Sequence, residues 1–208
     1  MKEMFITIFL TLIVVLSAFA GDFRKAEWGM TKEQVKAVEE ADRSSRAVGI
    51  TEDWKGWLLF RTSIRGLETS IWYEFEDEKL VSGSYSFTSV APERCSEFFD
   101  ELVETVGKKY GKPKVKNIWK PDPKLSKTWA NRSKAVLAGD LRRIAEWSTE
   151  RTAIKLELYS EKYDETWSKW SEKDSTFERL LHLDLSYYSK EYLERLKPEK
   201  EEWIDRIF

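Results

Sequence analysis

The sequence predicts an α+β fold, in which an antiparallel sheet of about five to six strands, a typical sheet size, carries helices packed on one face. Three observations lead to this prediction. Residues 56–87 alternate apolar and polar side chains with a period of two. Residues 92–110 repeat apolar side chains at helical spacing. The helix and the sheet then have one apolar side each, and packing these sides together buries both.

Residues 1–20 have the pattern of a secretory signal peptide. Lys2 precedes an uncharged, mostly apolar run over residues 4–16, and small residues lead up to Ala20. The run is shorter than the ~20 residues that a membrane-spanning helix needs. We therefore expect cleavage near Ala20, no stable membrane anchor afterwards, and a mature protein in the periplasm or outside the cell. Gly21 stands where a lipid-modified protein would present its cysteine.

The mature chain opens with a predicted helix over residues 32–40. Thr31 and Gln34 have the spacing of a capping box, in which two side chains satisfy backbone N–H groups at the helix start. The polar stretch at 41–53 has no clear period, and it is therefore predicted to be a loop.

Three predicted strands follow between Gly56 and Phe87. The apolar sides of these strands carry large side chains, namely Leu58, Phe60 and Ile64, then Ile71, Tyr73 and Phe75, then Val81, Tyr85 and Phe87. The opposite sides carry Trp57, then Trp72, Glu74 and Glu76, then Ser82, Ser84 and Ser86. This pattern predicts an antiparallel meander with one buried and one solvated face.

A helix is predicted from Pro92 to Tyr110, with Gly111 and Pro113 as its stop signals. Residues 112–131 are predicted to form a long connection with room for one extended segment. The remaining predicted elements are strands at 143–148, 152–159 and 181–187, a charged surface excursion at 161–175, and helices at 189–196 and 199–207.

These elements fit a single exported domain over residues 21–208. The order of helices and strands favours two related halves, 21–111 and 112–208, although no residue-level repeat accompanies it. Oligomeric state is left open by the sequence.

Charge and cysteine content narrow the possible functions. The formal net charge is -2, and removing residues 1–20 takes away one charge of each sign, so no electrostatic basis for binding nucleic acid exists. Cys95 is the single cysteine, which excludes an internal disulfide. It lies on the apolar stripe of its helix, so we expect a buried, unreactive thiol.

The stretch from Gly29 to Val35, GMTKEQV, resembles the opening helix of two groups of exported bacterial proteins. These are the small outer-membrane-assembly lipoproteins and the β-lactamase inhibitory proteins. The resemblance implies a helix-plus-antiparallel-sheet unit, which the second group carries twice in tandem. It also implies a binding role rather than a catalytic one, and it assigns no functional residue in this chain.

Catalytic and metal sites find little support. His182 is the only histidine, and with Cys95 it cannot form a His/Cys metal cluster. His182, Asp184 and Ser186 have the residue types of a triad, but in a strand they are ordinary side chains of one face. We therefore predict no catalytic residue, no metal and no cofactor.

The candidate binding residues are Trp57, Trp72, Glu74 and Glu76. Exposed indoles mark recognition surfaces, and the sequence predicts these residues outside the apolar face. The alternative is that the tryptophans cover a second side of the sheet beneath the long connections, because most Trp is largely buried. The preferred function is a non-catalytic protein-interaction module of the cell envelope. An extracytoplasmic carbohydrate binder or weak glycoside hydrolase is an alternative, because such enzymes place two carboxylates beside a sugar groove. An inhibitor of a secreted enzyme is a second alternative, implied by the tandem resemblance.

Overall fold

The computed structural model describes residues 21–41, 48–54, 56–121, 123, 128–162 and 179–196. The predicted signal peptide at 1–20 and the predicted helix at 199–207 lie outside the described residues. So does the predicted excursion, apart from Glu161 and Lys162, which belong to a strand. None of the described helices is long and apolar enough to cross a bilayer.

Eight strands form one sheet in the order β1-β2-β3-β4-β8-β7-β6-β5. The strands are β1 (Val48–Trp54), β2 (Trp57–Ile64), β3 (Leu67–Glu76), β4 (Lys79–Phe87), β5 (Lys114–Trp119), β6 (Leu141–Ser148), β7 (Thr152–Lys162) and β8 (Arg179–Ser189). All neighbouring pairs are antiparallel. The α+β fold with an antiparallel sheet is therefore confirmed, whereas the predicted number of strands is too low.

The two strands that raise the number to eight are β1 and β5, which lie at the two edges of the sheet. The predicted loop at 41–53 is wrong, because β1 occupies its second half. β5 is the extended segment that the sequence allowed within 112–131. Edge strands pair on one side only and are rich in charged residues, so the apolar alternation that reveals a central strand is weak in them.

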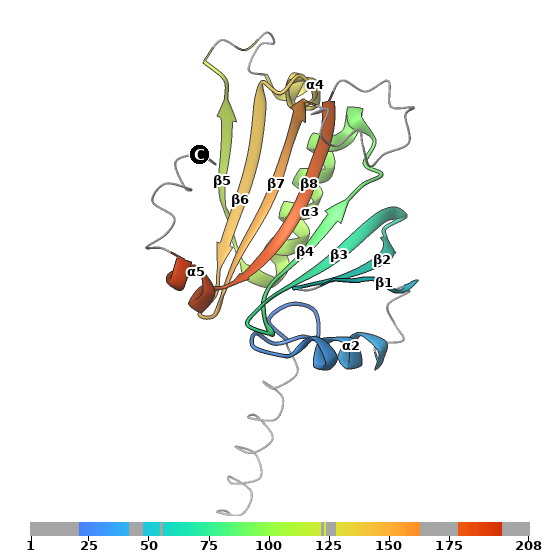
Figure 1. Cartoon of the computed structure of the whole chain (residues 1–208). Coiled ribbons are helices and arrows are strands. Elements are labelled where there is room, and N and C mark those ends of the chain that lie inside the picture. Colours follow the sequence, from blue (N-terminus) through green and yellow to red (C-terminus); the bar gives the residue numbers. More distant parts are fainter. Residues whose placement is uncertain are drawn as a thin grey trace, which may run out of the picture.

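Four strands on each side of the sheet form a meander, β1–β4 and β5–β8, and the two meanders meet where β4 pairs with β8. In Figure 1, β5–β8 run side by side, whereas β1–β4 turn away from them, so the sheet is strongly twisted. A helix precedes each meander: α2 (Lys32–Ala41) comes before β1, and α3 (Cys95–Tyr110) comes before β5. The order of one helix followed by four strands therefore occurs twice, and its second occurrence begins with α3. That the two halves are a true repeat stays a prediction.

The predicted helix signals are found at the expected places. Thr31 N donates to Gln34 Oε1 at 2.8 Å, and Gln34 N donates to Thr31 Oγ1 at 3.4 Å, which is the capping box at the start of α2. A short 3-10 turn at Pro92–Arg94 leads into α3. Ser189 Oγ accepts a hydrogen bond from Tyr192 N at 3.4 Å at the start of α5 (Lys190–Leu196). The sequence did not predict α4 (Arg132–Leu137).

One face of the sheet, the helical face, is covered by α2, α3 and α4. Contacts place these helices there: Tyr73 OH donates to Glu39 of α2, Arg143 donates to the Ser96 carbonyl of α3, and Ser160 Oγ donates to the Val136 carbonyl of α4. The helical face carries the buried core side chains of the strands, including Leu58, Phe60, Ile71, Tyr73, Ala145, Ile154, Leu156, Leu158, Leu183 and Leu185. Helices on one face are therefore confirmed for these three.

Two buried charged residues tie the helical face together. Arg24 donates to both carboxylate oxygens of Glu39 at 2.8 and 2.9 Å, and Glu39 also accepts the Tyr73 hydroxyl at 2.5 Å. Arg143, only 2% exposed, donates to the carbonyl of Ser96 at 2.9 Å and to Asp100 Oδ1 at 2.7 Å. Such groups are tolerated in a core because their hydrogen bonds are satisfied.

The segment before α2 packs on the centre of the sheet. Phe23 is 1% exposed, and its ring contacts the rings of Tyr73, Tyr85 and Tyr187. It lies over Gly83 of β4, where an added Cβ would collide with the Phe23 ring.

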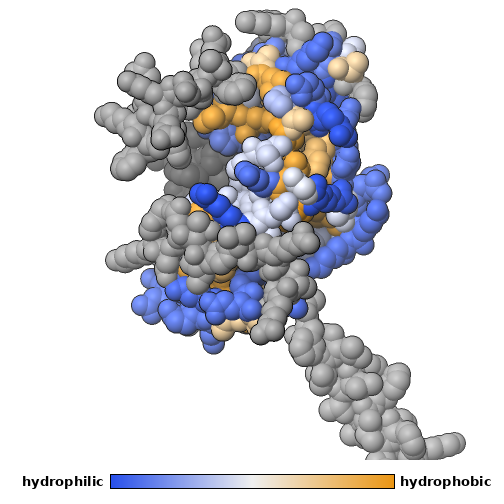
Figure 2. Space-filling model, turned by 90° about the vertical axis from the view of Figure 1, so that its right-hand side faces the viewer, coloured by the Kyte–Doolittle hydropathy of each residue, from blue (hydrophilic) through white to orange (hydrophobic). Residues whose placement is uncertain are grey.

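Seen from the side of β1–β4, hydrophobic residues gather in a band that hydrophilic residues border (Figure 2).

Candidate functional site

The opposite side of the sheet, which we call the outer face, carries the predicted binding residues. Strand alternation and the pairing register place the following side chains on it: Trp57 and Leu59 of β2, Trp72, Glu74 and Glu76 of β3, Ser82, Ser84 and Ser86 of β4, His182, Asp184, Ser186 and Tyr188 of β8, Lys155, Glu157 and Tyr159 of β7, and Arg142, Ile144 and Glu146 of β6. None of α2, α3 and α4 lies on this face.

An aromatic pair lies at the β2–β3 end of the outer face. The rings of Trp57 and Trp72 meet edge to face, with centroids 6.2 Å apart and planes at 89°. Trp57 is 40% exposed, whereas Trp72 is half-buried. Trp57 therefore exposes a large indole, and the edge-to-face contact with Trp72 fixes the position of that indole.

Glu74 lies beside the aromatic pair. It is the cross-strand partner of Trp57, and its Oε2 accepts a hydrogen bond from Ser82 Oγ at 2.7 Å. Tyr188 lies opposite Ser82 on β8, and burial raises the pKa of its phenol. Tyr188 therefore stays neutral, and its hydroxyl is a permanent donor and acceptor.

Glu76 lies one step further along β3 and has a different partner. Its Oε2 is 3.2 Å from Nη2 of Arg195 on α5, and both side chains are exposed at the rim of the outer face. The structure therefore brings Trp57, Trp72 and Glu74 together and assigns Glu76 to the contact between the sheet and α5.

The centre of the outer face carries hydroxyl groups. Ser84 and Ser86 of β4 pair across to Ser186 and Asp184 of β8. Burial raises the pKa of Asp184 above its usual value of 3.8, while a hydrogen bond with Ser86 opposes the increase. The two central strands therefore offer short polar side chains with little conformational freedom to lose on binding.

The β7–β6 end of the outer face carries paired charges. Glu157 accepts from Lys155 Nζ at 2.9 Å and also from Nε of Arg142. Arg142 lies 5.1 Å above the ring of Tyr159, whose pKa is raised to about 12, mainly by burial. Because these charges already have partners, this end of the face is rigid and its polar groups are oriented.

The residues of the triad hypothesis have other neighbours. The His182 ring stacks on Tyr159 with centroids 4.7 Å apart, and its Nε2 lies 2.9 Å from Oε1 of Glu161. Asp184 pairs with Ser86 instead. The interpretation of these residues as ordinary side chains of one strand face agrees with this arrangement.

Cys95 lies on the helical side, where it is buried as predicted. Burial raises the pKa of its thiol, which disfavours the reactive thiolate.

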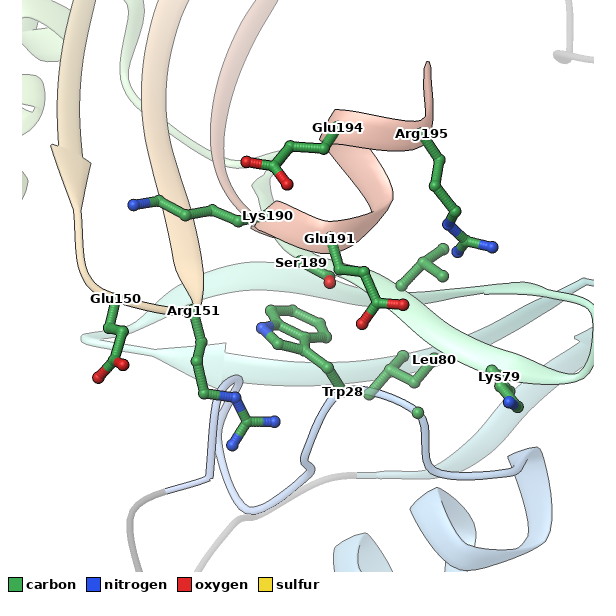
Figure 3. A pocket seen from close by; sticks show the side chains of 12 residues that line it. Trp28, Lys79, Leu80, Glu150, Arg151, Ser189, Lys190, Glu191, Glu194 and Arg195 are labelled. Carbon is green, nitrogen blue, oxygen red and sulfur yellow. The ribbon is translucent and has the colours of Figure 1, made fainter. Parts of the chain in front are cut away.

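A pocket of about 490 Å³ lies where the turns of the two meanders meet α5. In Figure 3, Trp28 and Leu80 lie opposite the first turn of α5. Trp28 Nε1 donates to Thr152 Oγ1 at 3.0 Å, and Arg151 is 3.1 Å from Asp22. These groups fasten the N-terminal segment to β7, so we interpret the pocket as a structural junction.

Sequence reasoning missed the groups around the predicted site, namely Ser82, Tyr188, Tyr159 and Arg142. Ser82 and Tyr159 each lie on the polar side of a predicted strand, so alternation was a usable signal for them, whereas Arg142 and Tyr188 lie one residue outside the predicted strands at 143–148 and 181–187. The signal could not show which strands are neighbours, because β4 and β8 are about a hundred residues apart in the chain.

No family model, curated protein or solved structure matches the chain. Among the described residues, no three histidine, cysteine or carboxylate side chains group to hold a metal ion. The outer face combines indole, phenol and hydroxyl groups with paired charges.

Proposed function

We propose that the protein is an exported, non-catalytic interaction module that binds a protein of the cell envelope through its outer face. One observation carries the proposal: the exposed indole of Trp57 lies beside a row of hydroxyl groups on the face of the sheet opposite α2, α3 and α4.

The composition of the outer face resembles that of protein-recognition surfaces. Antibody-type binding sites are rich in Tyr and Ser, with Trp at the contacts that matter most, because rigid rings supply contact area and small hydroxyls supply adaptable hydrogen bonds. The outer face combines Trp57 and Trp72 with Tyr188 and with the serines of β4. Its charges are already paired, so a partner meets an oriented polar surface and not isolated charges.

The geometry favours binding over glycoside hydrolysis. A hydrolase needs two carboxyl groups facing one groove, one of them protonated. Glu74 is engaged by Ser82, and Glu76 is engaged by Arg195 on another element. The two predicted carboxylates therefore serve different contacts.

Export is the second part of the proposal and is supported by the pattern of residues 1–20. N-terminal sequencing of the protein recovered from its native cells tests it. We expect a mature chain that begins near Gly21 in the periplasmic or external fraction. A chain that keeps Met1 and remains in the cytoplasm would contradict export.

Cross-linked capture from the native cells tests the interaction. The wild type, Trp57→Phe and Trp57→Thr are compared, because phenylalanine keeps an aromatic ring on β2 and threonine removes it. Lys108→Ala, which changes an exposed side chain of α3 on the other side of the sheet, is the control. We expect one protein to be captured by all variants except Trp57→Thr. Capture that is equal for all four chains would overturn the outer face as the binding surface.

A carbohydrate ligand is the second candidate, because Trp57 lies directly opposite the carboxylate of Glu74, and an indole beside a carboxylate suits a sugar ring. Titration with envelope glycans, followed by tryptophan fluorescence, separates the candidates. A saturable change that Trp57→Thr abolishes would favour the glycan. If the captured protein is instead a secreted enzyme that the module inactivates, the inhibitor alternative holds.

A further inference from the structure

A second feature of the sheet points to a different interaction, at its β5 edge. β5 is the last strand in the sheet order, and no described strand pairs with its outer side. Its six residues pair with β6 in continuous register from Lys114↔Glu146 to Trp119↔Leu141. A straight edge strand of this kind exposes a row of unpaired backbone groups.

The hydrogen bonding with β6 shows which backbone groups point outward. Lys120 N donates to Asp140 O at 2.9 Å, so this single hydrogen bond continues the antiparallel ladder of β5 and β6 by one step and marks Lys120 as a residue that bonds toward β6. Hydrogen-bonded pairs occur at every second residue, so the even-numbered residues of β5 bond to β6. The N–H and C=O groups of Val115, Asn117 and Trp119 therefore point away from the sheet.

Apolar side chains accompany these outward-pointing backbone groups. Val115 is 45% exposed and Ile118 is 39% exposed. They are two of the three large hydrophobic side chains that are exposed in the described part of the chain, and Trp57 is the third. The opposite edge differs, because the pairing of β1 with β2 has two register shifts, which interrupt a template for a further strand.

The charge of the edge selects the partner. Residues 112–120 contain Lys112, Lys114, Lys116 and Lys120 and no acidic residue, in a chain whose net charge is -2. Lys116 and Lys120 pair with Glu146 and Asp140 of the same sheet. A second copy of this chain would bring lysines opposite lysines, which is unfavourable. An acidic strand would instead bring carboxylates to Lys112 and Lys114.

We propose that β5 binds an extended acidic segment of a partner protein, which adds to the sheet as a further strand. The segment hydrogen-bonds to the backbone of Val115, Asn117 and Trp119. Its carboxylates lie on the outer face beside the lysines of the edge, and its apolar side chains lie on the helical face and pack on Val115. Backbone pairing supplies affinity and the alternate side chains supply selectivity, as in other cases of strand addition.

Backbone amide exchange of the full chain, measured by NMR, tests this inference. The probe is a capped hexapeptide of alternating glutamate and valine, and the comparison is the same peptide with lysine in place of glutamate. The amides of Val115, Asn117 and Trp119 exchange quickly in the free protein and become protected only with the glutamate peptide. Equal protection by both peptides would overturn the charge preference. Protection without peptide, or protection that increases with protein concentration, would show that the chain itself or a second copy occupies the edge, and would overturn the proposal.

Two substitutions separate backbone pairing from side-chain contact. Val115→Pro removes an outward N–H without touching the ladder to β6, a position at which edge strands tolerate proline. Val115→Thr keeps the N–H. Loss of one such hydrogen bond should lower the affinity of Val115→Pro for the glutamate peptide about ten-fold. The affinity of Val115→Thr, which keeps the hydrogen bond, should fall clearly less. Equal weakening in both variants would contradict strand addition.

Discussion

The two faces of the sheet use the same residue types in opposite ways. Arg143 and Arg142 are neighbours on β6 and point to opposite faces. Arg143 is enclosed beneath α3, with its guanidinium 4.3 Å from the Phe99 ring. Arg142 keeps a side chain that is 31% exposed and pairs with Glu157 on the outer face. The comparison indicates that polar groups on the helical face hold the fold together, whereas those on the outer face shape a surface.

Arg143→Ala should have the largest effect on stability. It removes the four hydrogen bonds that the three guanidinium nitrogens donate to Ser96, Asp100 and Asn117, and it leaves their oxygens without this partner. Because Asp100 is partly exposed and can be hydrated, we expect a loss of about 3 kcal/mol in the free energy of unfolding. Urea unfolding measures it. Arg142→Ala, the matched change on the outer face, should cost about 1 kcal/mol or less, and equal losses would remove the distinction between the faces.

Gly83→Ala should have the next largest effect on stability, because it changes the close contact between β4 and Phe23. The new Cβ would collide with the Phe23 ring, and overpacking of this kind costs about 2 kcal/mol. Gly107→Ala in α3 is the control, since no atom lies within 4 Å of the added Cβ. It should stabilise the helix by about 0.5 to 1 kcal/mol. Thermal unfolding of both variants measures the contrast, and a neutral Gly83→Ala would show that the Phe23 contact is loose.

Asp184→Asn should have a smaller, pH-dependent effect. Burial raises the pKa of Asp184 in the folded state, so the folded state holds this proton more tightly than the unfolded chain. The resulting stability is full below the usual pKa of 3.8 and is lost as the pH rises through the folded-state pKa. Asp184→Asn should therefore gain stability relative to the wild type between acidic and neutral pH.

Ser86→Ala provides the opposite change for the same carboxyl group. Because the hydrogen bond with Ser86 opposes the raised pKa, its removal should enlarge the loss of stability on going to neutral pH. Unfolding measured across this pH range tests both variants. A stability difference that does not vary with pH in either variant would contradict the account of Asp184.

The sequence predicted the central strands, missed β1 and allowed β5 only as an extended segment without exact bounds, for a physical reason. β2, β3, β4, β6, β7 and β8 bury one side, so selection for a core leaves a period of two in their residues. β1 and β5 pair on one side only and contain charged residues such as Glu52 and Lys116, so the period is lost. α4 is only six residues long and has too few turns for a recognisable helical period.

The candidate site was predictable along a strand but not across strands. Alternation was enough to place Trp72, Glu74 and Glu76 on one side of β3, and the structure agrees. It could not separate Glu74, which faces Ser82, from Glu76, which faces Arg195, because those partners come from other elements. Pairing of β4 with β8 depends on long-range contacts, and local sequence does not encode them.

The most direct test of the outer face measures stability and partner binding on the same variant, Trp57→Thr. Trp57 is 40% exposed and threonine suits a strand, so the free energy of unfolding should change by about 1 kcal/mol or less. If the outer face binds the partner, Trp57→Thr keeps its fold and loses the captured partner, while Trp57→Phe keeps both. A Trp57→Thr chain that is folded and still captures the same partner would contradict it.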